Sequence, residues 1–244
     1  MRLLIGTPAY GNMVTTDYLV SMARTIRGFL RDGVDYSLYA LGNESLINRG
    51  RNTIANLALR DGYDKLLFID ADIGWDYNDV CRVLNTNKPI IGGVYPNKAF
   101  PLTLNFNSLL DHASIFEKVE AKGLKTYRKT VDKFIDYRDM YADKTTGEVE
   151  VMHITTGFMV VDVKKVFEKL KDKVANYSQM DFYSGISKQL YEFFPVGVKN
   201  GVLESEDWAF CSLAREAGIP VYLNTKVILN HTGSYTFDVK RGMA

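Results

Sequence analysis

The stretch Leu66-Leu67-Phe68-Ile69-Asp70-Ala71-Asp72 runs from four apolar residues directly into two carboxylates. A short, continuous apolar run of this kind is typical of a buried strand that is covered on both faces. In an α/β sheet such a strand ends at the carboxyl edge, where these folds bind ligands. The paired carboxylates repel unless a cation or hydrogen-bond donors neutralise them, and a hard divalent ion would do so. Alternatively, Asp70 and Asp72 only cap the following turn or helix.

Length and composition describe an ordinary soluble globular protein of 244 residues. The formal net charge of +1 creates no overall field for nucleic acid or a membrane surface, so a nucleic-acid partner is not supported. Cys81 and Cys211 lack metal-type spacing, and we expect both to be reduced. No apolar run approaches the ~20 residues that span a bilayer. No signal peptide is visible either, because the N-terminus goes directly into the apolar strand Leu3-Leu4-Ile5. We therefore expect a cytoplasmic protein without a membrane span.

Strand and helix patterns alternate along the first part of the chain. Strands are expected at residues 2–5, 36–41, 66–69 and 89–94, and helices at 15–31, 48–60 and 76–84. This alternation predicts an α/β fold with a doubly wound parallel sheet. No repeat or linker divides the chain, so we expect a single domain over residues 1–244.

The later part of the chain has a mixed pattern. A variable insertion is expected near residues 107–150, with an antiparallel hairpin around Lys144-Thr145-Thr146-Gly147. A hydrophobic strand ends at Asp162, helices follow at 163–174 and from 204, and a last strand begins at 219. The aromatic-rich stretch 177–195 would suit an acceptor sugar, or would pack over the sheet edge.

Two segments at predicted strand or helix ends are suited to a nucleotide. Gly6-Thr7-Pro8-Ala9-Tyr10-Gly11 is expected to be a turn, in which glycine allows close backbone approach and Tyr10 could stack on a base. Asn48-Arg49-Gly50-Arg51-Asn52 opens a helix, where positive charge opposes the helix dipole. A bound phosphate would explain these arginines. The alternatives are a plain turn and a solvated basic turn.

Four motifs in chain order resemble those of GT-A fold glycosyltransferases, the nucleotide-sugar-dependent kind. Asp70-Ala71-Asp72 resembles the metal-binding DxD, and Thr156-Gly157-Phe158 the glycine loop near the donor sugar. Glu206-Asp207 resembles the xED motif, and His231 the C-terminal metal-binding histidine. The resemblance spans roughly residues 3–235. It implies a GT-A, Rossmann-like fold, with a mixed, mainly parallel sheet flanked by helices.

The resemblance implies a metal site formed by Asp70, Asp72 and His231, with Asp70 acting directly or through water or the ribose. A histidine ligand favours Mn²⁺ over Mg²⁺. Alternatively, His231 is a strand-end histidine bonded to nearby backbone. The implied donor and nucleotide contacts are Thr7, Pro8, Ala9, Tyr10, Asn43, Arg49, Arg51, Asn52, Asp70, Ala71, Thr156 and Gly157.

Glu206 and Asp207 are the implied catalytic residues. If the reaction inverts the anomeric carbon, Asp207 would be the general base for the acceptor hydroxyl. If it retains configuration, the pair would position donor or acceptor. Alternatively, the two residues are only the acidic start of a helix.

The implied function is metal-dependent hexosyl transfer from a UDP- or GDP-linked sugar to a glycan or another hydroxyl acceptor. Nucleotidyl transfer is an alternative that uses similar carboxylates, but it would need a basic residue in the 6–11 loop, which has none. A non-catalytic nucleotide- or sugar-binding module with a structural metal is a further alternative.

Overall fold

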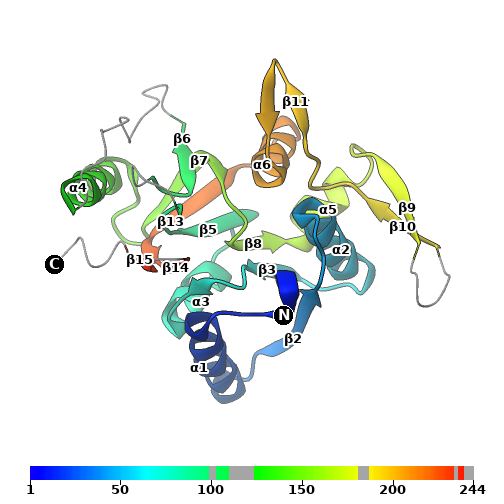
Figure 1. Ribbon diagram of the computed structural model, residues 1–244, viewed down its shortest axis with the longest axis horizontal. Coiled ribbons are helices and arrows are strands. Elements are labelled where there is room, and N and C mark those ends of the chain that lie inside the picture. The colour runs from blue at the N-terminus through cyan, green and yellow to red at the C-terminus, as the bar shows by residue number, and fades with distance from the viewer. Residues whose placement is uncertain (99–102, 110–123, 181–186, 234–235, 239–244) are drawn as a thin grey trace.

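The centre of the computed structural model is one eight-stranded sheet (Figure 1). The structure describes residues 1–98, 103–109, 124–180, 187–233 and 236–238. The strand order is β2-β1-β3-β8-β5-β13-β7-β6, and β7 and β8 run antiparallel to the other strands. These strands are β1 (Arg2–Ala9), β2 (Asp35–Gly42), β3 (Lys65–Ile69), β5 (Ile90–Val94), β6 (Phe106–Ser108), β7 (Glu148–Ile154), β8 (Phe158–Asp162) and β13 (Val221–Ile228).

Helices cover both faces of this sheet (Figure 1). They are α1 (Thr16–Asp32), α2 (Ile47–Arg60), α3 (Tyr77–Leu84), α4 (Leu124–Tyr141), α5 (Val163–Leu170) and α6 (Glu206–Glu216). Side chains of β3 alternate between the faces: Leu66 and Phe68 belong to the core cluster that includes residues of α2, α4, α5 and α6, whereas Leu67 and Ile69 belong to the one that includes residues of α1 and α3. Burial on both faces explains the continuous apolar run. The predicted Rossmann-like, mainly parallel α/β class is confirmed.

Smaller elements surround the sheet. A three-stranded sheet has the order β15-β14-β4. Two antiparallel pairs, β9 with β10 and β11 with β12, form separate two-stranded sheets. These elements are β4 (Ile73–Gly74), β9 (Asn176–Met180), β10 (Ser187–Tyr191), β11 (Gly197–Lys199), β12 (Val202–Glu204), β14 (Asn230–Thr232), β15 (Thr236–Asp238) and the 3-10 turn η1 (Tyr10–Asn12). The small sheet matters most for the site, because it places β14 beside the chain that leaves β3.

Helix ends follow local sequence signals. The Thr15 hydroxyl accepts a hydrogen bond from the Tyr18 amide at 3.3 Å and caps α1, which ends at Gly33 with φ of 66°. The Asp162 carboxylate caps α5 by accepting from the Lys165 amide at 2.9 Å. These ends agree with the expected helices to within a few residues.

The turn expected at residues 6–11 is wrong in its first part, because β1 continues to Ala9. Strand β2 pairs with β1 as far as Ala9 and Gly42, whereas β3 pairs with it only as far as Gly6. Beyond Gly6 the strand has a partner on one side only, an edge position that tolerates Pro8 without its backbone N–H.

The expected hairpin around Lys144–Gly147 is also wrong. Helix α4 precedes this turn, and β7 pairs with β6 and β13 instead. The Asp143 side chain accepts from the amides of Thr145 and Thr146 at 2.9 and 2.6 Å, which makes a tight turn between helix and strand. Residues 110–123 of the expected insertion lie outside the described residues.

Two further expectations concern the cysteines and the membrane. Cys81 and Cys211 are free thiols, as expected. Within the described ranges, no helix is both long and apolar enough to cross a bilayer.

Candidate functional site

Asp72 and His231 meet at the carboxyl end of β3. The register of β4 with β14 places His231 opposite Ile73, and the Thr232 amide donates to the Asp72 carbonyl at 2.9 Å. Nε2 of His231 lies 3.5 Å from Oδ1 of Asp72. The structure therefore brings together two of the three residues proposed for the metal.

The His231 ring has a defined orientation. Its Nδ1 lies 2.8 Å from the Pro96 carbonyl oxygen, and the ring packs edge-on against Tyr95. Because a carbonyl only accepts, Nδ1 carries the proton that faces Pro96, and Nε2 is the ring nitrogen that faces Asp72. A backbone carbonyl that holds the other ring nitrogen is a common arrangement for a metal-binding histidine.

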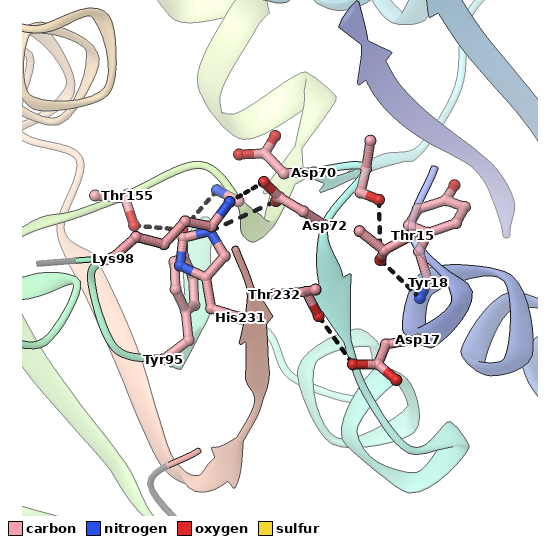
Figure 2. A network of polar contacts seen from close by, with 12 residues as sticks. Thr15, Asp17, Tyr18, Asp70, Asp72, Tyr95, Lys98, Thr155, His231 and Thr232 are labelled. Atoms are coloured by element: carbon pink, nitrogen blue, oxygen red, sulfur yellow. Dashed lines mark hydrogen bonds and ion pairs between the residues drawn. The ribbon is translucent and has the colours of Figure 1, made fainter. Parts of the chain in front are cut away.

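Asp72 is ionised and has a second partner, Lys98. Figure 2 shows Lys98 and His231 converging on the Asp72 carboxylate, and the lysine ammonium contacts Oδ2. Burial acts to raise the pKa of Asp72, but the neighbouring His231 and Lys98 side chains lower this pKa to about 2. The carboxylate therefore stays charged at neutral pH.

Asp70 faces a different partner, the guanidinium of Arg51. Arg51 Nη2 donates to Oδ2 of Asp70 at 3.0 Å, and Nη1 lies 2.7 Å from Oδ1. Arg51 is also 3.9 Å from Glu206 through Nε, and its side chain is only 3% exposed. Arg51 thus lies inside the protein as a partner of two carboxylates.

The glycine loop lies against the first aspartate. The Asp70 amide donates to the Gly157 carbonyl, and the Gly157 amide donates to the Tyr95 hydroxyl, both at 2.9 Å. A Cβ at Gly157 would lie 2.3 Å from the Tyr95 hydroxyl oxygen and 3.0 Å from Asp70 Oδ2, so this approach requires glycine. Thr156 is buried, and its hydroxyl has no hydrogen-bond partner within the described part of the chain.

Glu206 and Asp207 begin α6, and Glu206 lies beside Arg51. Oδ1 of Asp207 accepts from the Trp208 amide at 2.8 Å and from the Ser205 hydroxyl, which holds the carboxylate in place. Burial first, and then the neighbouring Asp207 charge, raise the pKa of Glu206. The Trp208 ring stacks on His153 at 4.9 Å, so one ring face of the partly exposed tryptophan is covered.

Other expected nucleotide contacts are engaged elsewhere. The Thr7 hydroxyl is buried and lies 2.7 Å from the Tyr18 hydroxyl. Arg49 pairs with Glu44, with Nε 2.6 Å from Oε2. Asn52 is buried and accepts from the Phe194 amide at 2.9 Å.

The remaining expected contacts lie at the same sheet edge as Asp70. Strand register places Ala9 opposite Gly42, so Tyr10 and Asn43 both follow the ends of paired strands. Tyr10 is 75% exposed and Pro8 is half-buried, whereas Ala9 is buried. The Ala71 carbonyl accepts from the Thr15 amide at 2.8 Å, which ties the loop between the two aspartates to the start of α1.

Sequence reasoning missed several residues that shape this region. Lys98 and Tyr95 follow the predicted strand 89–94, and their place at a strand end is the signal that could have found them. Asn56, one helical turn after the expected contact Asn52, was also missed, and it binds the backbone of Tyr191. The aromatic stretch proposed for an acceptor is partly core, because Phe193 and Phe194 are fully buried. Its residues Phe182 and Tyr183 lie outside the described residues.

The donor set is compatible with a divalent ion of the Mn²⁺ type. A carboxylate oxygen and an imidazole nitrogen are 3.5 Å apart, and both are ligand types that such an ion accepts. Asp70 is directed to Arg51, so Asp72 and His231 are the protein ligands that fit. Among the residues that the structure describes, no group of three or more His, Cys, Asp or Glu side chains could hold a metal. A bound cation would therefore need further ligands from a substrate or from water.

Comparisons with known proteins support the fold. No protein-family profile and no curated protein sequence matches the chain. The crystal structure of A197 from STIV is similar over 96% of this chain and 86% of that one, with a TM-score of 0.52 and 16% identity. The structure of S. aureus TarS 1–349 in complex with UDP covers 72% of this chain and half of that one, with a TM-score of 0.33 and 10% identity. The likeness to A197 shows a shared fold, and the likeness to TarS is too low to carry an argument.

Proposed function

We propose that this protein is a glycosyltransferase that moves a hexose from a nucleoside diphosphate sugar to a hydroxyl acceptor such as a glycan. The observation that carries the proposal is the pairing of Asp72 with His231 at the carboxyl edge of the sheet. Parallel α/β sheets bind their ligands at this edge. The glycine loop and the Glu206-Asp207 helix start lie around the same edge, which supports one site and not several.

At the donor end, Asp72 and His231 would hold a divalent cation of the Mn²⁺ or Mg²⁺ type. When bound, such an ion stabilises the negative charge that develops on a leaving diphosphate. Gly157 lets Tyr95 and Asp70 approach its backbone closely, and would in this way hold Asp70 beside the donor sugar. Arg51 would act as a positioning residue that keeps the charged Asp70 in place.

At the acceptor end, Asp207 is suited to accept the proton of the acceptor hydroxyl in an inverting reaction. Its carboxylate is held by two hydrogen bonds from its own helix start. Glu206 lies deeper, beside Arg51, and would position Asp207 and Asp70. In a retaining reaction both residues would instead orient the substrates.

A nucleotide screen tests the proposal. Thermal unfolding would be followed with UDP, GDP and other nucleotides, each with and without Mn²⁺. We expect a metal-dependent rise in Tm with UDP or GDP, because a ligand that binds only the folded state stabilises it. Hydrolysis of UDP- and GDP-hexoses would then identify the donor. Indifference to every nucleotide would reject the proposal.

A further inference from the structure

The Asp72 carboxylate already holds a positive charge, the ammonium of Lys98. The ammonium contacts Oδ2, while Oδ1 faces Nε2 of His231 at 3.5 Å (Figure 2). Asp70 adds no free charge here, because Arg51 binds both of its oxygens. A divalent ion that reached Asp72 would therefore meet Lys98 on the same carboxylate.

The lysine is held in this place by its stem. A Cβ at Gly233 would lie 3.0 Å from Cδ and 3.4 Å from Cγ of Lys98, so the aliphatic chain runs against this glycine. Gly233 comes two residues after His231 and directly follows β14, so the segment that carries the histidine also contacts the lysine stem. About a third of the Lys98 side chain, 33%, is exposed, so its head can move without opening the core.

Charge balance decides what can bind. One carboxylate cannot neutralise an ammonium and a divalent cation together, and the two cations repel at contact distance. A diphosphate brings negative oxygens that can bind both the cation and an ammonium.

We propose that Lys98 competes with the divalent cation for Asp72, and that an anionic diphosphate relieves this competition by giving the ammonium a new partner. The diphosphate part rests on the proposed function. Cation and donor then bind cooperatively, and each raises the affinity of the other by the same factor. Lys98 acts as a positioning residue that suppresses binding of the cation alone.

Mn²⁺ binding measured by electron paramagnetic resonance tests this inference without any enzymatic assay. Wild type, Lys98→Met and Lys98→Arg would be titrated with Mn²⁺ alone, and again with saturating UDP or GDP. We expect Lys98→Met to bind Mn²⁺ alone on the order of tenfold more tightly than wild type, and to gain less from nucleotide. Lys98→Arg keeps the positive charge and should stay close to wild type.

Lys171→Met is the matched control. It also removes one lysine that is paired with a carboxylate, Glu168 on α5, so the change in net charge is identical. Its Mn²⁺ affinity should equal that of wild type. An equal gain in Mn²⁺ affinity in this control would show that the lower net positive charge explains the effect, and would overturn the inference.

The proposed competition would also be overturned by equal Mn²⁺ affinity of wild type and Lys98→Met, or by the absence of Mn²⁺ binding in every variant. The two proposals can be told apart. A tighter Mn²⁺ site in Lys98→Met without any effect of nucleotide would support the competition at Asp72 and contradict the proposed donor.

Discussion

The buried guanidinium of Arg51 forms a bidentate ion pair with the Asp70 carboxylate: Nη1 lies 2.7 Å from Oδ1, and Nη2 donates to Oδ2 at 3.0 Å. The guanidinium also lies over the Phe68 ring, 5.3 Å from its centroid, and near Glu206. The pair joins helix α2 to the end of β3 and the start of α6. The two aspartates therefore have different partners, since Asp70 pairs with the buried Arg51 and Asp72 pairs with the partly exposed Lys98.

Arg51→Met should destabilise the protein strongly, because it leaves Asp70 and Glu206 without their buried cation. Removing one partner of a buried ion pair typically costs about 3–5 kcal/mol, and the 30% exposure of the Asp70 side chain favours the lower end. Urea denaturation measures the change. Arg60→Met is the control, because its pair with Asp61 is exposed and should contribute little. Similar losses in both variants would contradict a special role for the buried pair.

Asp72→Ala should abolish Mn²⁺-dependent hydrolysis of the donor while the fold remains intact. Loss of a charged group that acts on the transition state commonly reduces kcat by on the order of 100-fold or more. Hydrolysis rates and circular dichroism would be compared with those of wild type and of Asp35→Ala, a control at the start of β2. Unchanged hydrolysis in Asp72→Ala would reject the metal assignment.

Asp207→Asn should stop transfer to the acceptor but leave donor binding unchanged. A positioned general base contributes about 10²–10⁴-fold to rate, and the amide keeps the shape of the side chain without its basicity. Donor affinity by calorimetry and transfer rates would be measured on the same preparation. If donor affinity falls together with transfer, Asp207 is a positioning residue.

Asn52→Leu should release the segment that carries Phe194. Asn52 accepts from the Phe194 amide at 2.9 Å, and a buried backbone group that loses its partner costs about 1–3 kcal/mol. Hydrogen exchange would show faster exchange of the Phe194 amide, while amides in β3 stay protected. Asn56→Leu should act in the same way on the Tyr191 amide, which Asn56 binds at 2.9 Å. Wild-type exchange at both amides would show that packing alone holds the segment.

His153 should make stability depend on pH in the acidic range. Burial lowers its pKa below the ordinary value of 6.5, so the unfolded chain takes up the proton first. The contribution of neutral His153 to the free energy of unfolding is then fully present above about pH 6.5. It is lost as the pH falls from there through the lowered pKa. Denaturation at several pH values, compared with His153→Gln, measures this loss. The variant should lose this part of the pH dependence. An NMR titration that gives His153 a pKa of 6.5 or above in the folded protein would contradict the prediction.

The sequence by itself determined the α/β class, the buried strand at 66–69 and the position of Asp70 and Asp72 at its end. These features depend on local rules, because a strand buried on both faces must be apolar throughout and a helix must bury one stripe. Helix ends were predictable for the same reason: Thr15 and Asp162 act on amides three residues away.

Only the tertiary structure decided what each charged residue does. The register of β4 with β14 brings His231 close to Asp72. The packing of α2 near the end of β3 lets Arg51 pair with Asp70, and the stem of Lys98 packs against Gly233. None of these partners is near the other in sequence, so no periodicity or spacing encodes the contact. Ion pairs form between groups that packing brings together, and for this reason Arg51 proved to be a buried partner of Asp70 and Lys98 a cation at Asp72.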